Sequence, residues 1–383
     1  MKQMKSYYGR PAARVQFISP AAMPFVAFEW KHAPAALRKA MAAASSVASH
    51  QNRLDLIRLV AAVQVMLSHC FSHLGYGETA FAALISLFPG VPIFFVVSGY
   101  LVSQSYDQCR NLADYGRRRF NRIFPALWGA LAFSAATVLL LHPIEVGTFL
   151  LWIVAQATLL QDWHPDALRT YGVGVVNGSL WSIPVELSFY VALPVVALFR
   201  TRWLVGLAAV SFSILYVAEG FVETFAGKLV LASPLPWIGM FLAGVLAYRA
   251  QWRPSVKLWA PLFAAVTAAS LLLAENPLLH TAGNFSGVLN FAALAGLTFA
   301  LAFSGTLRLP VDLSYGIYLY HMPVLNAALS LGLAGAGALT TVVAVSAAMA
   351  MLSWAAIERK MATRRRAVRK DAPAALELGA TGA

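Results

Sequence analysis

Two ionisable residues stand in the first long apolar run of the chain, where a membrane-spanning helix does not ordinarily carry them. Arg58 and His69 lie eleven residues apart in residues 54–75. A helix turns about 100° and rises about 1.5 Å per residue, so both side chains share one face, about 16 Å apart. Ionisable groups inside a bilayer are costly and usually functional. A neutral imidazole in this place is suited to act as a general base.

A carboxylate stands in another apolar run, at a comparable expected depth. Glu186 is the only charge in residues 179–199 and lies a few residues from the outer end of that run. We therefore expect Glu186 to meet His69 and to orient its imidazole, as the third group of a catalytic triad does. The alternative is a structural polar cross-link between two helices.

A cluster of arginines follows the second apolar run, in residues 117–125. Arg119 and Arg122 are three residues apart and share one face of a helix. Because guanidinium groups suit phosphate recognition, we expect Arg119 and Arg122, with Arg118 beside them, to bind the phosphates of a nucleotide-bearing donor. The alternative is that these arginines only mark the cytoplasmic side of the membrane.

Two possible nucleophiles are set aside. Ser98 precedes Gly99, and small residues commonly allow close helix packing, so packing is favoured over a nucleophilic serine. Cys70 follows His69, but neighbouring helical side chains point about 100° apart. With Cys109, it makes too few cysteines for a disulfide framework. No metal-ligand spacing is present, so no metal site is predicted.

The composition indicates the fold class. Of 383 residues, 59% are hydrophobic and only 12% are charged, against about 25% charged in globular domains. Several charge-poor runs approach the roughly 20 residues needed to cross a bilayer. The net charge of +13 is gathered at the ends of these runs. That placement is typical of cytoplasmic loops and argues against nucleic acid as a partner. The sequence predicts an all-α, polytopic transmembrane protein.

The charge pattern also predicts the topology, with about ten spans. If 359–370 is cytoplasmic, both termini are cytoplasmic, and residues 146–160 begin and end outside, as a re-entrant or interfacial segment. This arrangement leaves Arg58 within the first span and only Arg169 and Lys228 outside. The expected spans are 54–75, 79–103, 123–141, 179–199, 203–218, 229–247, 258–274, 286–307, 313–330 and 339–357.

Three regions are expected along the chain. Residues 1–50 form a poorly ordered or surface-helical N-terminal extension, or reflect a translation start placed too far upstream. Residues 51–360 form the membrane-embedded domain. Residues 361–383 form a basic cytoplasmic tail.

Together these motifs resemble the acyltransferase 3 family of integral membrane acyltransferases. The resemblance covers residues about 52 to 360, and five motifs stand in the family's order, although each alone is loose. They are Asp55 and Arg58 with His69; the run 94–100 with Ser98; the run 117–125; the run 180–190 with Trp181, Glu186 and Tyr190; and the run 313–323 with Tyr315, Tyr318 and His321.

The resemblance implies about ten spans in a bacterial inner membrane. It also implies an acyl-transfer reaction. Members take an acyl group, most often acetyl, from cytoplasmic acyl-CoA and place it on a sugar hydroxyl of a cell-envelope or exported glycan. We therefore expect membrane lipid, acyl-CoA and a carbohydrate as partners, acyl-CoA as co-substrate and no bound cofactor. The expected catalytic residues are His69, Glu186 and Arg58. The expected cavity residues are Asp55, Ser98, Trp181, Tyr190, Tyr315, Tyr318 and His321.

Other interpretations stay open at this point. A transporter or flippase of a lipid-linked glycan also carries intramembrane charge, and an inactive scaffold is a third reading. Succinyl and longer branched acyl groups are alternatives to acetyl, and a macrolide or a lipid is an alternative acceptor. Some members carry an extra periplasmic hydrolase-like domain after the membrane domain; none follows Lys370, so a stand-alone membrane unit is expected.

Overall fold

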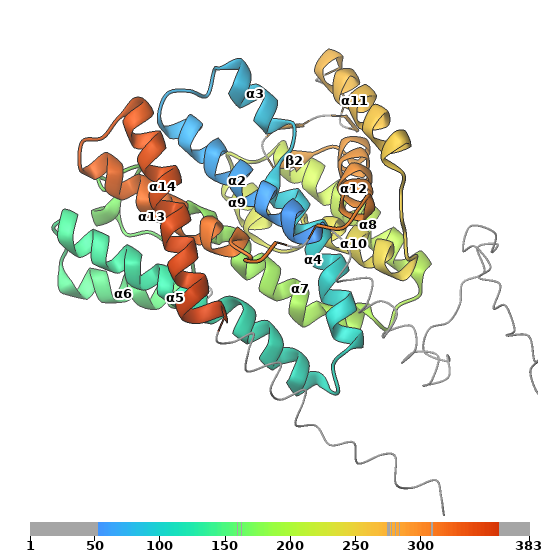
Figure 1. The fold of residues 1–383 in the computed structure, drawn as a ribbon, viewed down its shortest axis with the longest axis horizontal. Helices are drawn as coiled ribbons and strands as arrows, with labels where there is room; N and C mark the ends of the chain where they lie inside the picture. Colours follow the sequence, from blue (N-terminus) through green and yellow to red (C-terminus); the bar gives the residue numbers. More distant parts are fainter. Residues whose placement is uncertain are drawn as a thin grey trace, which may run out of the picture.

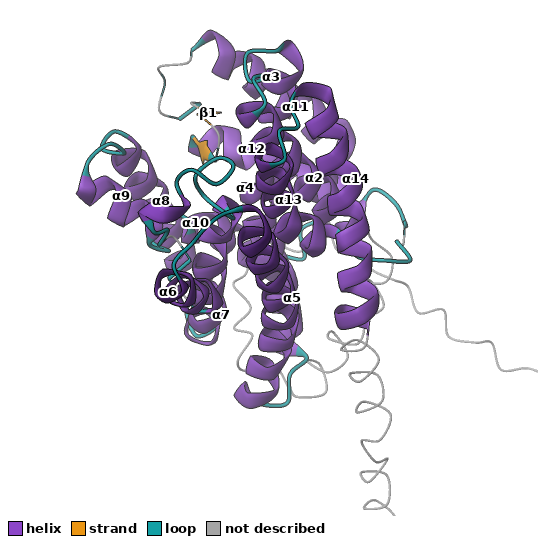
Figure 2. Cartoon of the chain, turned by 90° about the vertical axis from the view of Figure 1, so that its left-hand side faces the viewer, coloured by secondary structure: helices purple, strands orange, loops and turns teal. Residues whose placement is uncertain are grey.

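The computed structural model describes residues 53–359, except residues 159, 162, 274, 275, 277, 280, 283 and 308. The predicted extension 1–50 and tail 361–383 lie outside the described residues. The described chain is built from helices, as predicted, with one short antiparallel strand pair, β1 (Thr281–Ala282) and β2 (Phe285–Ser286), that was not predicted (Figure 2).

The helices follow one another through the bundle shown in Figure 1. The longer ones are α2 (Leu54–His73), α3 (Ala80–Ser86), α4 (Gly90–Asp107), α5 (Leu112–Leu141), α6 (Val146–Ala157), α7 (Ser182–Val196), α8 (Thr201–Glu219), α9 (Phe225–Ala232), α10 (Ile238–Arg249), α11 (Val256–Leu272), α12 (Val288–Phe303), α13 (Ser314–Ser330) and α14 (Gly335–Ser353). Short helical turns are η3 (Asp166–Leu168), η4 (Gly178–Trp181) and the π-helical η5 (Trp354–Glu358).

Six helical segments of the described chain are long and apolar enough to cross a membrane: Leu54–His73, Ala80–Asp107, Leu112–Leu141, Gly178–Val196, Thr201–Glu219 and Gly335–Ile357. Of the other four predicted spans, 229–247 is divided between α9 and α10, which have 8 and 12 residues. The remaining three fall on α11, α12 and α13, which have 17, 16 and 17 residues. Helices α6 and α10, each with 12 residues, are shorter than the roughly 20 residues needed to cross a bilayer.

The outer surface of the bundle is apolar, as expected of an integral membrane protein. Leu140, Val191 and Leu272 are about four-fifths exposed, at 81%, 79% and 83%. Large exposed apolar side chains on several helices are unfavourable in water and match the hydrocarbon of a bilayer. The polar side chains described below lie between the helices instead.

Helix α5 begins earlier than the predicted start at residue 123. The side chain of Asn111 accepts a hydrogen bond from the Asp114 N–H (2.8 Å) and caps the first turn. Arg119 and Arg122 therefore belong to this helix rather than to a loop before it. Their spacing keeps them on one face, as the sequence predicted.

The predicted second span is broken into α3 and α4. Pro89 precedes Gly90, and a residue before proline is disfavoured in the helical conformation, so α3 ends before it. Gln64 of α2 stabilises the break. Its amide accepts from the Gly90 N–H (2.7 Å) and donates to the Ile85 carbonyl (3.2 Å).

Helices α4 and α10 pack with their backbones close together. A Cβ added at Gly99 would lie 2.0 Å from the Phe241 carbonyl oxygen, and one at Gly244 would lie 1.9 Å from the Val96 carbonyl oxygen. Only hydrogen fits at either position, so Gly99 serves close helix packing, as predicted.

Gly244→Ala is expected to destabilise the protein, because the added methyl forces α10 away from α4. Overpacking of this kind costs about 1–3 kcal/mol or more. Thermal unfolding of the purified protein in detergent measures the loss. Gly206→Ala is the matched control, because a Cβ there meets nothing within 4 Å. An equal unfolding temperature for both variants would contradict the packing argument.

The loop between α6 and α7 is fastened to α13. Asn326 accepts from the Val173 N–H (2.7 Å) and donates to the Val176 carbonyl (3.0 Å), while Asn177 donates to a carbonyl of α13 (2.9 Å). Gly172 has a φ of +56° and lies against Asn326, where a Cβ would come within 2.1 Å of its side-chain oxygen. These contacts hold the loop against α13.

Candidate functional site

A cavity lies between α2, α4, α5, α7 and α13. It holds about 760 Å³ of empty space, including the part open to solvent. Its walls are formed by Arg58, Val91, Phe94, Phe95, Ser98, Leu101, Val102, Arg119, Arg122, Ile123, Ser182, Ile183, Glu186, Tyr190, Tyr315 and Tyr318. The structure thus brings together many of the residues singled out from the sequence.

One end of the cavity is built around Asp312, in the link before α13. Its Oδ2 accepts from Arg58 (2.8 Å) and from Arg122 (3.1 Å). Its Oδ1 accepts from the hydroxyl (2.6 Å) and the backbone N–H (3.2 Å) of Ser314. Burial alone would raise the pKa of Asp312, but the two guanidinium charges outweigh it and hold this pKa well below its usual range. Asp312 therefore stays ionised and holds both arginines together.

Arg119 lies at the same end. It donates to the Ser105 hydroxyl (2.7 Å), and its guanidinium lies 5.4 Å from the centre of the Tyr190 ring. Its Nε is buried and has no hydrogen-bond partner within the described part of the chain. Arg118 instead bonds Asp114 (2.7 Å) on its own helix and does not line the cavity. Of the three predicted donor-binding arginines, two share the cavity with Arg58.

The middle of the cavity is polar. Glu186 Oε1 accepts hydrogen bonds from Ser98 (3.0 Å) and from Tyr190 (2.5 Å). Ser98 comes from α4, and the other two residues lie one turn apart on α7. These bonds tie α4 to α7 and keep a carboxylate on the cavity wall.

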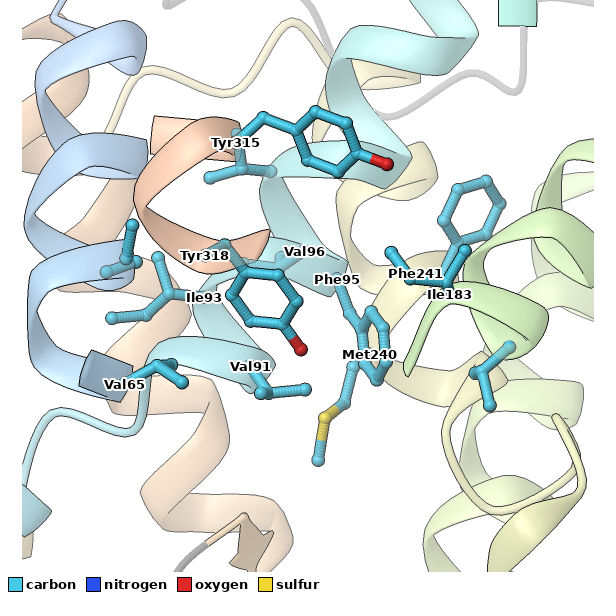
Figure 3. Close-up of a cluster of buried hydrophobic side chains, with 14 of the residues drawn as sticks. Val65, Val91, Ile93, Phe95, Val96, Ile183, Met240, Phe241, Tyr315 and Tyr318 are labelled. Carbon is cyan, nitrogen blue, oxygen red and sulfur yellow. The ribbon is translucent and has the colours of Figure 1, made fainter. Parts of the chain in front are cut away.

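The far end of the cavity is mostly apolar and is closed by Tyr318. The Tyr318 hydroxyl donates to the Ser179 carbonyl (2.7 Å) and lies 2.7 Å from the Ser182 hydroxyl. Its ring packs edge-on against Phe94, with centroids 5.5 Å apart. Figure 3 shows the Tyr318 ring projecting from α13 beside Val91, with Tyr315 above it in the view.

Two histidines meet behind Tyr318. His69 Nδ1 lies 2.8 Å from His321 Nε2, and His321 Nδ1 lies 3.0 Å from the Ile317 carbonyl oxygen. Because a carbonyl only accepts, His321 Nδ1 must carry a proton. Its Nε2 in the neutral ring then accepts from His69 Nδ1–H. This leaves the lone pair of His69 Nε2 for an incoming proton.

The His69 partner differs from the predicted one. Glu186 was expected to orient His69, but Glu186 accepts hydrogen bonds from Ser98 and Tyr190, while His321 is bonded to His69. Sequence reasoning placed both groups at one depth in the membrane. Depth does not specify which face of each helix points toward the other, so the pairing could not be predicted.

Three other predicted residues lie outside the cavity wall. Asp55 is 3.8 Å from Arg58 and its side chain is 53% exposed. Trp181 packs behind the wall, with its ring 6.4 Å from that of Phe95. His321 is fully buried and contacts Tyr318, with ring centroids 6.1 Å apart. In the described ranges, no three His, Cys, Asp or Glu side chains gather in a way that would hold a metal ion.

Asp312 was missed by the sequence interpretation. It directly precedes the motif that begins at residue 313, and it is the only acidic residue in residues 304–313. The available signal was this carboxylate beside an apolar segment, in a chain whose sequence assigned no carboxylate partner to Arg58 or Arg122.

Comparisons with known proteins identify a family for this chain. A family model described as an acyltransferase domain, that of acyltransferase 3, matches residues 51–358. Nodulation protein 10 of Rhizobium leguminosarum bv. viciae is 34% identical, over 81% of this chain and 93% of its own length. The O-acetyl transferase of Shigella phage Sf6 is 28% identical, over 82% of this chain and 96% of its own length. Exopolysaccharide production protein ExoZ of Rhizobium meliloti (strain 1021) is also 28% identical, over 80% of this chain and 98% of its own length. No solved structure matches significantly.

Proposed function

The chain belongs to the acyltransferase 3 family, and from that premise we propose that it moves an acyl group from cytoplasmic acyl-CoA to a hydroxyl of a cell-envelope or exported carbohydrate. It is an O-acyltransferase. The observation that supports the donor is one cavity with arginines at one end and a histidine pair beyond the other.

The donor enters at the arginine end. Arg58, Arg119 and Arg122 bind the phosphates of the nucleotide portion, since guanidinium forks match phosphate oxygens. The pantetheine arm then lies along the cavity past Glu186. Its two amide groups find polar partners there, and its thioester reaches the end closed by Tyr318.

His69 is the general base in the transfer step. Its Nε2 takes the proton of the acceptor hydroxyl while the oxygen attacks the thioester carbon and forms a carbon–oxygen bond. The carbon–sulfur bond breaks, and the CoA sulfur receives the proton from the imidazolium. The products are the ester and free CoA thiol. His321 positions His69 by fixing its tautomer, so the role assigned to Glu186 from the sequence passes to His321.

The acceptor is a carbohydrate on the far side of the membrane. Two of the relatives carry names that support this acceptor class, an O-acetyl transferase and an exopolysaccharide production protein. The name O-acetyl transferase specifies an acetyl group, and we propose acetyl as the group transferred here. We further propose ten crossings of a bacterial inner membrane with both termini in the cytoplasm, because this topology keeps the described arginines of α5 and α10 on the cytoplasmic side.

Acyl-CoA turnover tests this proposal. Membranes containing the protein are given acetyl-CoA and native glycans, and free thiol and the mass of extracted glycans are followed together. We expect thiol release in step with a glycan mass gain of one acetyl group. A glycan transporter would release no thiol, so absence of release across several acyl-CoA donors would overturn the proposal.

A further inference from the structure

The cavity changes character along its length. Helix α7 supplies Ile183 at one end, Glu186 in the middle and Tyr190 beside Arg119 at the other. Ile183 and Tyr190 are seven residues apart, about 10 Å along the helix. Along α4, Ser98 lies between the apolar residues Val91 and Phe95 on one side and Val102 on the other. The charges at the other end come from Arg58, Arg119 and Arg122. The cavity is therefore charged, then polar, then apolar.

This sequence of surfaces matches the parts of an acyl-CoA. Its phosphates are charged, its pantetheine arm carries two amides and its acyl group is apolar. With the phosphates at the arginines, the arm lies along the polar middle, and the acyl group falls at the apolar end. We propose that this end is the acyl-binding pocket and that Val91, Phe95 and Ile183 restrict it to short, uncharged acyl groups. This inference rests on the proposed function and narrows its donor class.

The pocket is short because its walls are fixed. Val91, Phe95 and Ile183 are 3%, 2% and 1% exposed. The ring of Phe95 is held between those of Trp181 and Phe189, at centroid distances of 6.4 and 5.2 Å. Packed interiors do not yield readily to added methylene groups. Figure 3 shows Val91, Phe95 and Ile183 gathered on the hydroxyl side of the Tyr318 ring.

The pocket also disfavours a charged acyl group. No charged side chain is found among the described residues at this end of the cavity wall. The two hydroxyl groups there, of Tyr318 and Ser182, are bonded to each other and to the Ser179 carbonyl. A succinyl carboxylate would lose its water without gaining a partner, which is costly.

The pocket lies beside the histidine pair. The Tyr318 ring is 6.1 Å from the His321 ring, and His321 bonds His69. The pocket is therefore connected to the base His69 through Tyr318 and His321.

Acyl-chain preference tests the inference. Thiol release is measured with acetyl-CoA, butyryl-CoA and succinyl-CoA for the wild type and for Ile183→Ala. We expect the wild type to prefer acetyl-CoA. In the variant, the ratio of kcat/KM for butyryl-CoA over acetyl-CoA should rise about tenfold or more, since each methylene in an apolar pocket changes discrimination by such a factor. Succinyl-CoA should remain a poor donor for both proteins.

Leu193→Ala is the matched control, because Leu193 is equally buried on the same helix but does not line the cavity. In this control, the ratio of kcat/KM for butyryl-CoA over acetyl-CoA should stay at the wild-type value. If Ile183→Ala does not fold, Val91→Ala removes less volume from the same pocket and should raise the ratio in the same direction.

The outcomes separate the two proposals. Acetyl transfer with an unchanged butyryl ratio in the Ile183 and Val91 variants overturns the acyl pocket and leaves the acyltransferase reaction standing. A wild type that prefers butyryl-CoA or succinyl-CoA also overturns the pocket. Absence of thiol release from every acyl-CoA contradicts the proposed function, and the pocket with it.

Discussion

His69→Ala is expected to lower the rate of acyl transfer by about 10²–10⁴-fold, the usual contribution of a general base. The hydrogen-bond chain from the Ile317 carbonyl through His321 leaves His69 Nε2 as the proton acceptor. Alanine removes that acceptor but leaves the arginine end untouched. The KM for acyl-CoA should therefore stay near the wild-type value while kcat falls. Initial rates of thiol release at varied acyl-CoA, with equal amounts of protein, measure both.

His73→Ala is the matched control for this prediction. His73 lies one turn further along α2, with its ring 6.4 Å from that of His69, but it is exposed. Its replacement should change kcat little. If His73→Ala and His69→Ala lose activity equally, the assignment of the base is wrong.

His321 offers a second check on the same base. His321→Ala leaves His69 Nδ1–H without an acceptor, and an unmatched buried donor costs about 1–3 kcal/mol. His321→Gln restores a hydrogen-bond acceptor and should recover part of the activity. If His321 only filled space, the His321→Gln variant would not recover activity relative to His321→Ala.

Asp312→Asn is expected to raise the KM for acyl-CoA about tenfold or more, with a smaller change in kcat. The wild-type carboxylate binds Arg58 and Arg122 through one oxygen. Without its charge the two guanidinium groups repel each other and lose their common orientation. Hydrogen bonds to charged groups are worth about 1.5–3 kcal/mol, and about 1.4 kcal/mol is a tenfold change in affinity. The donor dependence of thiol release measures the effect.

Asp55→Asn is the control for this second prediction. Asp55 also faces Arg58, but at 3.8 Å and with its side chain half exposed, where an ion pair contributes little. Its effect on KM should be small. Equal effects of the two substitutions would mean that general electrostatics around Arg58, and not the ion pairs of Asp312 with Arg58 and Arg122, governs donor binding.

The pH dependence of the ion pairs of Asp312 with Arg58 and Arg122 can also be predicted. The pKa of folded Asp312 is depressed, so its ion pairs stabilise the protein above the unfolded value of about 4. That stability is lost only as the pH falls through the lower folded pKa. From pH 9 down to pH 5, Asp312 should therefore contribute no change in donor affinity or unfolding temperature.

Local spacing predicted much of the site. Arg58 and the neighbouring pair Arg119 and Arg122 could be placed on helix faces because helical geometry alone relates residues a few turns apart. The all-helical class followed from charge-poor runs of nearly bilayer length. These predictions depend on short stretches of sequence, in which the period of the helix is the only geometry needed.

Pairing between distant helices could not be predicted in this way. His69 and His321 are 252 residues apart, and Arg58 and Asp312 are 254 apart. Their contacts depend on the rotation of α2 and α13 about their own axes, which is set by packing across the whole bundle. The break between α3 and α4 was missed for a simpler reason. Apolar residues continue on both sides of Pro89, and hydropathy does not register the change of direction.

These two long-range pairs join the first and the penultimate long helix of the described domain, and this has a consequence for biosynthesis. A ribosome adds about 5–20 residues per second, so α2 leaves it about 10–50 s before α13. Through that interval Arg58 and His69 lack their final partners, and unpaired ionisable groups are costly in lipid. The nascent first helix must therefore be sheltered, by the insertion machinery or at the membrane surface. The active centre is completed only after α13 has been made.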